Sequence, residues 1–310
     1  AIMGFREGNE FAGTGPFLTA LNAPKNAAGD EVTGPVKWMT IRSDNNDKFA
    51  QPDGLWIGAR GTATNVGFDG PALKGATNVV LPRVDHRETS FSPAAFEATY
   101  RFITGRAPQT SSAVAQTPVV LDGKLTGLGL TPTDPASGNF ANNLPLPGAT
   151  VEVFVTDPAT GERRGAAVHR KTVGADGRWG PFTAQAGAAH EFVISAPGYA
   201  TTHIYRSPFP RSSDLIHLRA ERLAEADKAA TSVVTFTRPR GYFDLARDRM
   251  ALDGKPLPGV GPGGAGLSSA KLVLKEPGVR AVAAEFNGEK LTGRSWPAAE
   301  NRVVSLELTY

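Results

Sequence analysis

The sequence of 310 residues predicts a multidomain protein whose first third is an α/β layer and whose remainder is β-rich. Three observations support this prediction. Strand and helix signals alternate before residue 106, with strand candidates at 36–41 and 78–81 and a helix at 93–104. Beyond residue 118, short alternating segments take the place of helical periodicity. The 35 glycines and 24 prolines exceed average usage, as expected for many tight turns.

The helix at 93–104 has clear limits in the sequence. Ser92 offers a capping hydroxyl, and Pro93 suits the first helical position. Gly105 can adopt the left-handed conformation that ends a helix. Between these limits apolar side chains recur at helical spacing, at Phe96, Tyr100 and Ile103.

The middle of the chain, residues 119–220, predicts a small β-sandwich of about seven short strands. Its segments VEVFV (151–155) and EFVIS (191–195) read as strands, and Pro-Gly and Asp-Gly pairs separate such segments. We expect it to fold independently. Residues 232–310 also hold strand candidates and predict a second small β-domain. The segments predicted as linkers are residues 107–118, which are small and polar, and residues 221–231, which are charged and alanine-rich.

Composition excludes several classes of function. The chain has no cysteine, so it has no disulfide, thiolate metal site or cysteine nucleophile. The net charge is +3 and no cluster of Lys and Arg is interleaved with aromatic residues, so no nucleic-acid partner is expected. No apolar run approaches 18 residues, so no transmembrane segment is expected. The sequence begins at Ala1 without a signal region, and we expect a processed, secreted or periplasmic protein or a start inside a longer chain.

Two polar turns follow the strand candidates of the first part, where open α/β sheets place their ligands. Asp47 lies in the first turn and His86 in the second. In this chain order they fit the last two members of a Ser-Asp-His triad. Such a carboxylate orients the imidazole, which takes the proton of the serine and returns it to the leaving group. Asp44 or Asp53 could replace Asp47 as the orienting acid.

Other groups near these turns have simpler interpretations. Asp85 is expected to contact the backbone or Arg83, although it could also help to position His86. The other four histidines have no metal-ligand spacing and are interpreted as structural. The Asp/Asn-rich residues 44–47 lack the spacing, glycine and closing glutamate of an EF-hand. We therefore predict no metal and no cofactor.

The first part resembles the C-terminal portion of an α/β-hydrolase of the secreted bacterial lipase and esterase type. The turn NDKFAQP (46–52) is similar to the acid turn of such lipases, and VDH (84–86) is similar to their Asp-His pair. The helix at 93–104 corresponds to their closing helix, and GTGPFLTALN (13–22) resembles a short helical stretch between their last two catalytic strands. The resemblance covers residues 1–106 and implies an ester hydrolase with Asp47 as acid and His86 as base.

The sequence departs from this family at the nucleophile. A Gly-x-Ser-x-Gly elbow should precede the acid, yet no serine in residues 1–46 lies in one, and Ser43 lies inside the acid turn. Ser268 and Ser295 each lie two residues after a glycine, but both follow His86 within the β-rich part. We expect the nucleophile, the oxyanion hole and most of the sheet to lie in an N-terminal half that this sequence lacks.

The second part has its own resemblance. LPLPGATV (144–151), TVGADGRW (172–179) and FVISAPGY (192–199) are similar, in order, to motifs of carboxypeptidase-regulatory-like, transthyretin-like domains. The resemblance implies a β-sandwich and says little about function, because such sandwiches serve many roles.

Together these features predict a partial α/β-hydrolase, comprising the C-terminal strands and helix of the sheet, followed by two small β-sandwich domains. The expected function is a serine ester hydrolase, a lipase or carboxylesterase acting on ester or lipid substrates. A polyester (polyhydroxyalkanoate) depolymerase is an alternative within this class. The other alternative is a non-catalytic protein that binds a surface or carbohydrate, with a degenerate hydrolase segment.

Overall fold

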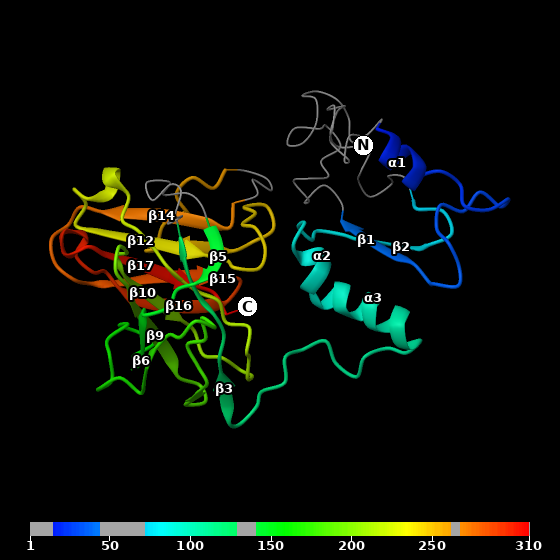
Figure 1. Ribbon diagram of the computed structural model, residues 1–310. Coiled ribbons are helices and arrows are strands. Elements are labelled where there is room, and N and C mark those ends of the chain that lie inside the picture. Colours follow the sequence, from blue (N-terminus) through cyan, green and yellow to red (C-terminus); the bar gives the residue numbers. More distant parts are fainter. Residues whose placement is uncertain (1–14, 44–71, 129–140, 262–266, 310) are drawn as a thin grey trace. The chain divides into compact units, whose positions relative to one another are not determined.

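The structure is a computed structural model that describes residues 15–43, 72–128, 141–261 and 267–309 (Figure 1). It is mostly β-sheet, with few helices in the described residues. The chain divides into two compact units. Unit 1 comprises Ala1–Ser112, Arg240–Arg247 and Gly261–Leu267; unit 2 comprises Ala113–Pro239, Asp248–Val260 and Ser268–Tyr310.

Unit 1 pairs two strands in parallel and carries short helices. Its elements are α1 (Pro16–Leu21), β1 (Met39–Ser43), β2 (Thr77–Leu81), α2 (Glu88–Phe91) and α3 (Pro93–Thr104). The predicted helix is confirmed, with Pro93 at its start, the Ser92 hydroxyl accepting a hydrogen bond from the Ala95 amide and Gly105 left-handed at its end. Among the described residues of unit 1, β1 and β2 form a two-stranded sheet. The larger sheet of a complete hydrolase fold is not seen in these residues.

The apolar stripe of α3 is largely open to solvent. Phe96 is 44% exposed and Ile103 is 74% exposed, whereas the buried core beneath the helix is small. That core contains Leu81, Val84 and Ala95, against which Ile41 and Val79 pack. Two strands offer too little surface to cover a helix of 12 residues.

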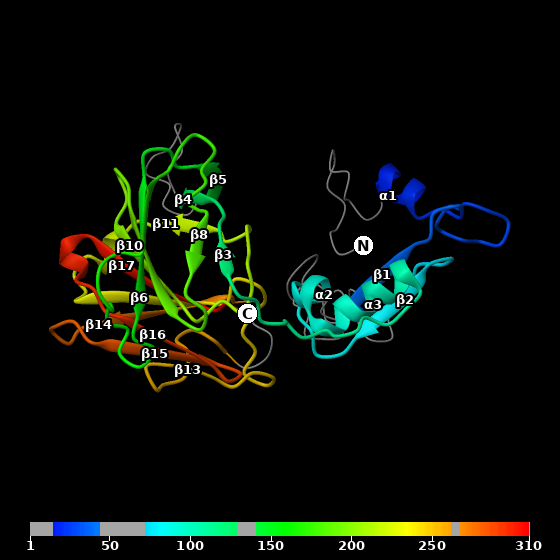
Figure 2. The same ribbon diagram turned by 90° about the horizontal axis from the view of Figure 1, so that it is seen from below.

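Unit 2 is built almost entirely of strands (Figures 1 and 2). They are β3 (Val119–Leu121), β4 (Leu125–Leu128), β5 (Ala141–Pro145), β6 (Thr150–Thr156), β7 (His169–Thr172), β8 (Phe182–Ala184), β9 (Ala189–Ser195), β10 (Thr201–Arg206), β11 (Leu218–Ala220), β12 (Ser232–Thr237), β13 (Met250–Leu252), β14 (Ser269–Leu274), β15 (Ala281–Phe286), β16 (Glu289–Arg294) and β17 (Arg302–Glu307). Two 3-10 turns, η2 (Glu225–Asp227) and η3 (Ala298–Glu300), connect some of them.

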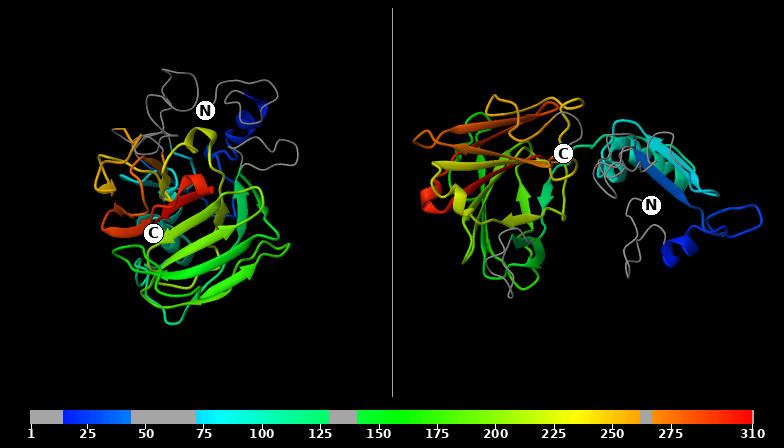
Figure 3. Two further views of the ribbon diagram at one scale, coloured as in Figure 1. Left: turned by 90° about the vertical axis from the view of Figure 1, so that its left-hand side faces the viewer. Right: turned by 90° about the horizontal axis from the view of Figure 1, so that it is seen from above.

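One seven-stranded sheet runs through unit 2 in the order β14-β12-β17-β10-β9-β6-β7, and most of its strands are labelled in Figure 1. Figure 3 gives two further views of the strands of this unit. Neighbouring strands within this sheet are antiparallel, except that β17 pairs in parallel with both β10 and β12. One face is covered by β3, β4, β8 and β11, which share a hydrophobic core with β6, β9 and β10. On the other face, β16 of the sheet β13-β15-β16 contacts β10 and β17.

The sheet differs from the expected division into two sandwich domains. Strand β10 lies before the expected linker at 221–231, and β17 lies in the expected third domain, yet Thr201–Arg206 pairs along its length with Arg302–Glu307. Residues 119–220 and 232–310 therefore share one sheet, because the edge of β10 is continued by a strand from about 100 residues further along the chain. The predicted independent folding of 119–220 would leave this edge uncovered.

The core of the predicted sandwich forms around Trp179. Its side chain is fully buried, and its indole N–H donates to the Ile216 carbonyl at 3.0 Å. Its ring meets that of Phe192 edge-on, with the centroids 5.3 Å apart. A buried tryptophan normally finds such a polar partner. Trp179 is thus a core aromatic of this sandwich.

A buried histidine on β9 predicts an acid-dependent loss of stability. His190 is 1% exposed and lies between the rings of Phe182 and Phe192. Neither of its ring nitrogens has a hydrogen-bond partner in the described part of the chain. Burial lowers the pKa of His190 to about 4, from an ordinary value of 6.5.

The direction of this pH effect on stability follows from proton binding to His190. Between these two pKa values the unfolded chain binds a proton that the folded chain excludes, so the free energy of unfolding falls as pH decreases from 6.5 towards 4. The loss is at most about 3 kcal/mol. In urea unfolding at a series of pH values, His190→Phe is expected to flatten this part of the stability curve. An unchanged slope in the variant would contradict the assignment.

Candidate functional site

Strands β1 and β2 end at the same edge of their sheet. The strands are parallel and in register from Met39 opposite Thr77 to Ser43 opposite Leu81. The carboxyl ends of both strands, Ser43 and Leu81, therefore lie side by side. The predicted acid Asp47 and its alternatives, Asp44 and Asp53, lie outside the described residues.

The predicted base His86 lies directly after β2, in the turn that leads into α2. Its side chain is exposed, and its backbone carbonyl accepts a hydrogen bond from the Thr89 hydroxyl at 2.7 Å. The preceding residue, Asp85, is only 2% exposed. An exposed imidazole next to a buried, fixed residue such as Asp85 can reach a reacting group and exchange protons with it.

Asp85 and Glu88 form a capping box around His86. The Asp85 carboxylate atom Oδ1 accepts from the amides of Arg87 at 2.8 Å and Glu88 at 3.0 Å. In return, Glu88 Oε2 accepts from the Asp85 amide at 2.8 Å. Reciprocal bonds of this kind fix the first turn of a helix. The expected contact of Asp85 with the backbone is present, and the carboxylate holds the backbone that follows His86.

A local signal for this arrangement is present in the sequence, although the prediction of a polar turn did not include it. The spacing Asp85-x-x-Glu88 is a capping-box pattern, and it predicts the short helix α2 that was interpreted as a polar turn. The contact of this turn with Tyr242 and Arg247, by contrast, joins residues more than 150 positions apart and has no local signal.

The two serines of the β-rich part do not form a nucleophile elbow. Ser295 follows β16 and is 1% exposed, and its hydroxyl accepts a hydrogen bond from the Arg280 amide at 2.9 Å. Ser268 precedes β14 and is partly buried. Neither lies between a strand and a helix, as the elbow requires. Ser43 is buried at the end of β1.

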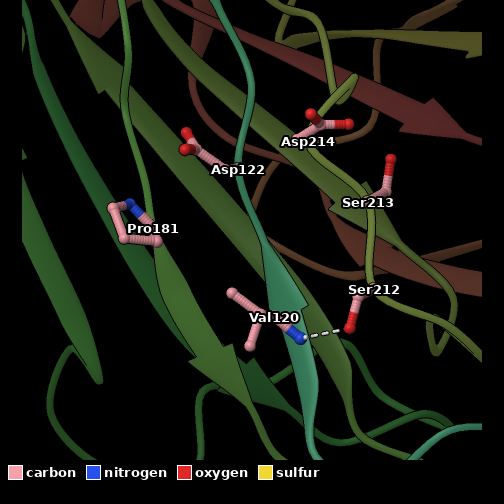
Figure 4. A pocket seen from close by; sticks show the side chains of 6 residues that line it. All are labelled: Val120, Asp122, Pro181, Ser212, Ser213 and Asp214. Atoms are coloured by element: carbon pink, nitrogen blue, oxygen red, sulfur yellow. Dashed lines mark hydrogen bonds between the residues drawn. The ribbon is translucent and has the colours of Figure 1, made fainter.

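Two adjoining pockets lie on unit 2. The first, of about 320 Å³, is lined by Val120, Asp122, Pro181, Ser212, Ser213 and Asp214 (Figure 4). The second, of about 400 Å³, is lined by Lys124, Thr126, Arg178, Asp214, Leu215 and His217. Asp214 lines both. Arg178 donates to Asp122 Oδ2, and these hydrogen bonds help to hold the pKa of the Asp122 carboxyl below its usual range although burial opposes them.

These pockets can offer hydrogen bonds to a polar ligand but hold no catalytic constellation. His217 Nε2 lies 2.7 Å from the Thr126 hydroxyl, and burial lowers the pKa of His217. A neutral histidine bonded to a hydroxyl resembles a base and its nucleophile. No hydrogen bond to a carboxylate that would orient the imidazole is found for His217 in the described residues.

The described residues contain no group of three or more His, Asp or Glu side chains placed to hold a metal ion. They also contain no helix that is both long and apolar enough to cross a bilayer. The remaining histidines have structural surroundings: His169 Nε2 lies 2.8 Å from the Trp179 carbonyl, and His203 is buried against Glu191.

Comparison with solved structures finds weak similarities. The shaft pilin SpaA of Lactobacillus rhamnosus GG has a TM-score of 0.26 at 12% identity, covering 62% of this chain and 98% of the pilin. The Bacillus anthracis TIE protein has a TM-score of 0.21 at 12% identity, covering 76% and 37%. Catechol 1,2-dioxygenase of Pseudomonas arvilla C-1 has a TM-score of 0.18 at 19% identity, covering 39% and 52%. Similarities at this level carry no functional conclusion.

The comparison with curated proteins finds no relative of the chain. One family does match, over a segment that nearly coincides with the predicted sandwich at 119–220. Residues 117–223 match the model of the lipase C-terminal domain. The chain therefore contains a segment similar to a lipase C-terminal domain, which associates it with lipases.

Proposed function

We propose that the chain is the C-terminal part of a serine ester hydrolase, a lipase or carboxylesterase that works through an acyl-enzyme. His86 is the general base and Asp47 the acid that orients it. The serine lies in sequence that precedes Ala1, in an N-terminal half of the hydrolase domain that is needed for activity. The substrate is a lipid or another ester, small or polymeric, met outside the cytoplasm.

The observation that carries the proposal is the parallel pairing of β1 and β2. It brings the carboxyl ends of the two strands, Ser43 and Leu81, to the same edge of the sheet, and in the sequence Asp47 and His86 follow these ends by four and five residues. Catalytic residues of open α/β sheets lie at this carboxyl edge. The match of residues 117–223 to a lipase C-terminal domain supports the same class of function from a separate part of the chain.

Two further features fit the proposal. The exposed stripe of α3, with Ile103 74% exposed, offers an apolar face that additional strands of a hydrolase sheet would cover. His86 follows a parallel strand and precedes a helix, which is the order in which hydrolases of this type place their histidine.

A fluorophosphonate probe tests this proposal, because it reacts covalently only with an activated serine. In the protein produced from its complete gene, we expect one labelled serine, located by peptide mass spectrometry before Ala1. Ser268→Ala and Ser295→Ala serve as matched controls and should label normally. No labelling of the protein, or labelling that either control abolishes, would contradict the proposal.

The second candidate function is ligand binding by the sandwich without catalysis. The two adjoining pockets that share Asp214 favour it, because hydroxyl, carboxylate and cationic side chains lie among their lining residues. Under this alternative the probe labels nothing, and substitution of His86 changes no activity.

A further inference from the structure

The 240–247 segment of unit 1 contacts the turn that carries His86. The amide of Tyr242 donates to Asp85 Oδ2 at 2.6 Å. The Arg87 guanidinium lies 4.6 Å from the centroid of the Tyr242 ring, within the range of a cation–π interaction. The residues before and after His86 are therefore both held by Tyr242.

Arg247 makes the larger set of contacts. Its Nη1 donates to Glu88 Oε2 at 2.5 Å and to the Arg83 carbonyl at 3.2 Å. Its Nη2 donates to the Tyr242 carbonyl at 2.9 Å and lies 3.7 Å from Asp85 Oδ2. One guanidinium thus links both members of the capping box, the end of the β2 turn and the segment itself.

These contacts are shielded from solvent. The side chains are 11% exposed for Arg247, 13% for Glu88 and 3% for Asp85. Charge-assisted hydrogen bonds are stronger than neutral ones, and water competes little for them at such sites. Removing Arg247 would leave the carboxylates of Asp85 and Glu88 close together without the positive charge that balances them.

Arg83 gives a second reason why the turn needs support. Its φ is 60°, in the left-handed region that residues other than glycine seldom adopt. Its carbonyl is the one that Arg247 binds. Strained backbone of this kind persists where surrounding contacts over-determine it, and it gathers at functional sites.

We propose that Arg247 is a positioning residue for His86, acting through Glu88, Asp85 and the Arg83 carbonyl. The segment 240–247 thereby makes the geometry of the catalytic turn depend on residues that follow the lipase C-terminal-like segment. Arg247 does not touch substrate. This inference rests on the proposed hydrolase function for its catalytic consequence, but the contact itself can be tested without it.

The catalytic test uses Arg247→Ala in the protein from its complete gene, with a soluble nitrophenyl ester. A small displacement of a catalytic group can cost about 100-fold in rate, and we expect kcat to fall about 10- to 100-fold while KM changes by less than about twofold. Arg247→Lys should recover part of kcat. Arg101→Ala, which removes an exposed ion pair with Glu97 on α3, is the matched control and should change kcat by less than about twofold.

Hydrogen exchange tests the contact independently of activity. The amides of Arg87, Glu88 and Tyr242 donate to Asp85, and in Arg247→Ala they should exchange about tenfold faster or more, while Arg101→Ala leaves them unchanged. Unchanged exchange would overturn the contact. Faster exchange with unchanged kcat would overturn positioning. An unmodified protein without esterase activity would overturn the proposed function and leave the exchange result to decide the contact.

Discussion

Replacing His86 by alanine is expected to lower turnover on a soluble ester at least about 10⁴-fold. A serine triad loses its general base in this variant, and no other group in the turn can take the serine proton and return it to the leaving group. The side chain is exposed, so the substitution should leave the fold intact. Turnover and thermal unfolding should be measured on the same preparation, and full activity without His86 would remove the hydrolase interpretation of this segment.

The three candidate acids can be ranked by the same assay. Asp47→Asn should lower turnover about 10⁴-fold, as the equivalent amide does in a chymotrypsin-type triad, because the amide can favour the wrong tautomer of the imidazole. Asp44→Asn and Asp53→Asn should cost less than about tenfold if these residues only shape turns. A larger loss at 44 or 53 than at 47 would assign the acid to that position.

Local signals in the sequence predicted the elements well. The cap at Ser92 and the stop at Gly105 gave the limits of α3, and the alternation in VEVFV and EFVIS gave β6 and β9. Pro-Gly and Asp-Gly pairs marked turns whose glycines have positive φ, as at Gly148 and Gly177. These features depend on a few neighbouring residues, so a single sequence contains them.

The arrangement of the elements in unit 2 could not be predicted in the same way. The parallel pairs that β17 makes with β10 and β12 join segments far apart in the chain. No local pattern in these segments indicates which strand each one pairs with. The charged stretch at 221–231 indicated a boundary, yet Asp227 within it is buried and bonded to Lys271 of β14. A polar composition therefore marked a connection within one sheet and not a division between domains.

The same division holds for the candidate site: its local features were predictable from the sequence, and its long-range contacts were not. The position of His86 after a strand and before a helix follows from local pattern, and the structure places it there. The contacts that fix its turn come from Arg247, whose partner Glu88 lies 159 positions away. A resemblance restricted to residues 1–106 could not include that partner. Long-range ion pairs of this kind are properties of the fold and not of a motif.

The largest loss of stability is expected from Glu191→Ala. Glu191 is 0% exposed on β9, and it lies 2.7 Å from His203 Nδ1 and 2.5 Å from Arg163 Nε. Burial alone would raise the pKa of this carboxyl, but the hydrogen bonds from His203 and Arg163 outweigh it and hold the pKa below its usual value. Glu191 is therefore an ionised group within the protein interior.

Its two partners are fixed by aromatic rings. The His203 ring stacks on Trp296 with the centroids 4.5 Å apart, and the Arg163 guanidinium lies 3.8 Å from the centroid of Phe154. Removing the carboxylate therefore leaves the buried His203 ring without its hydrogen-bond partner and the partly exposed Arg163 without its counter-charge. Leaving a buried polar group without its hydrogen-bond partner costs about 1–3 kcal/mol. Urea unfolding of Glu191→Ala, followed by tryptophan fluorescence, should show a loss of this size.

Glu152→Ala is the matched control, because the sheet offers the same residue type in a different environment. Glu152 lies on the neighbouring strand β6, opposite Val193, and its ion pair with Arg170 is open to solvent, the arginine side chain being 70% exposed. Exposed pairs contribute about 0–1 kcal/mol, because water screens the charges and the side chains lose freedom when they pair. Equal losses for the two variants would show that burial does not set the strength of the Glu191 contacts. A loss confined to Glu191→Ala would show that this buried carboxylate joins β9 to its surroundings. It binds His203 of β10, whose ring stacks on Trp296, and Arg163 of the β6–β7 connection.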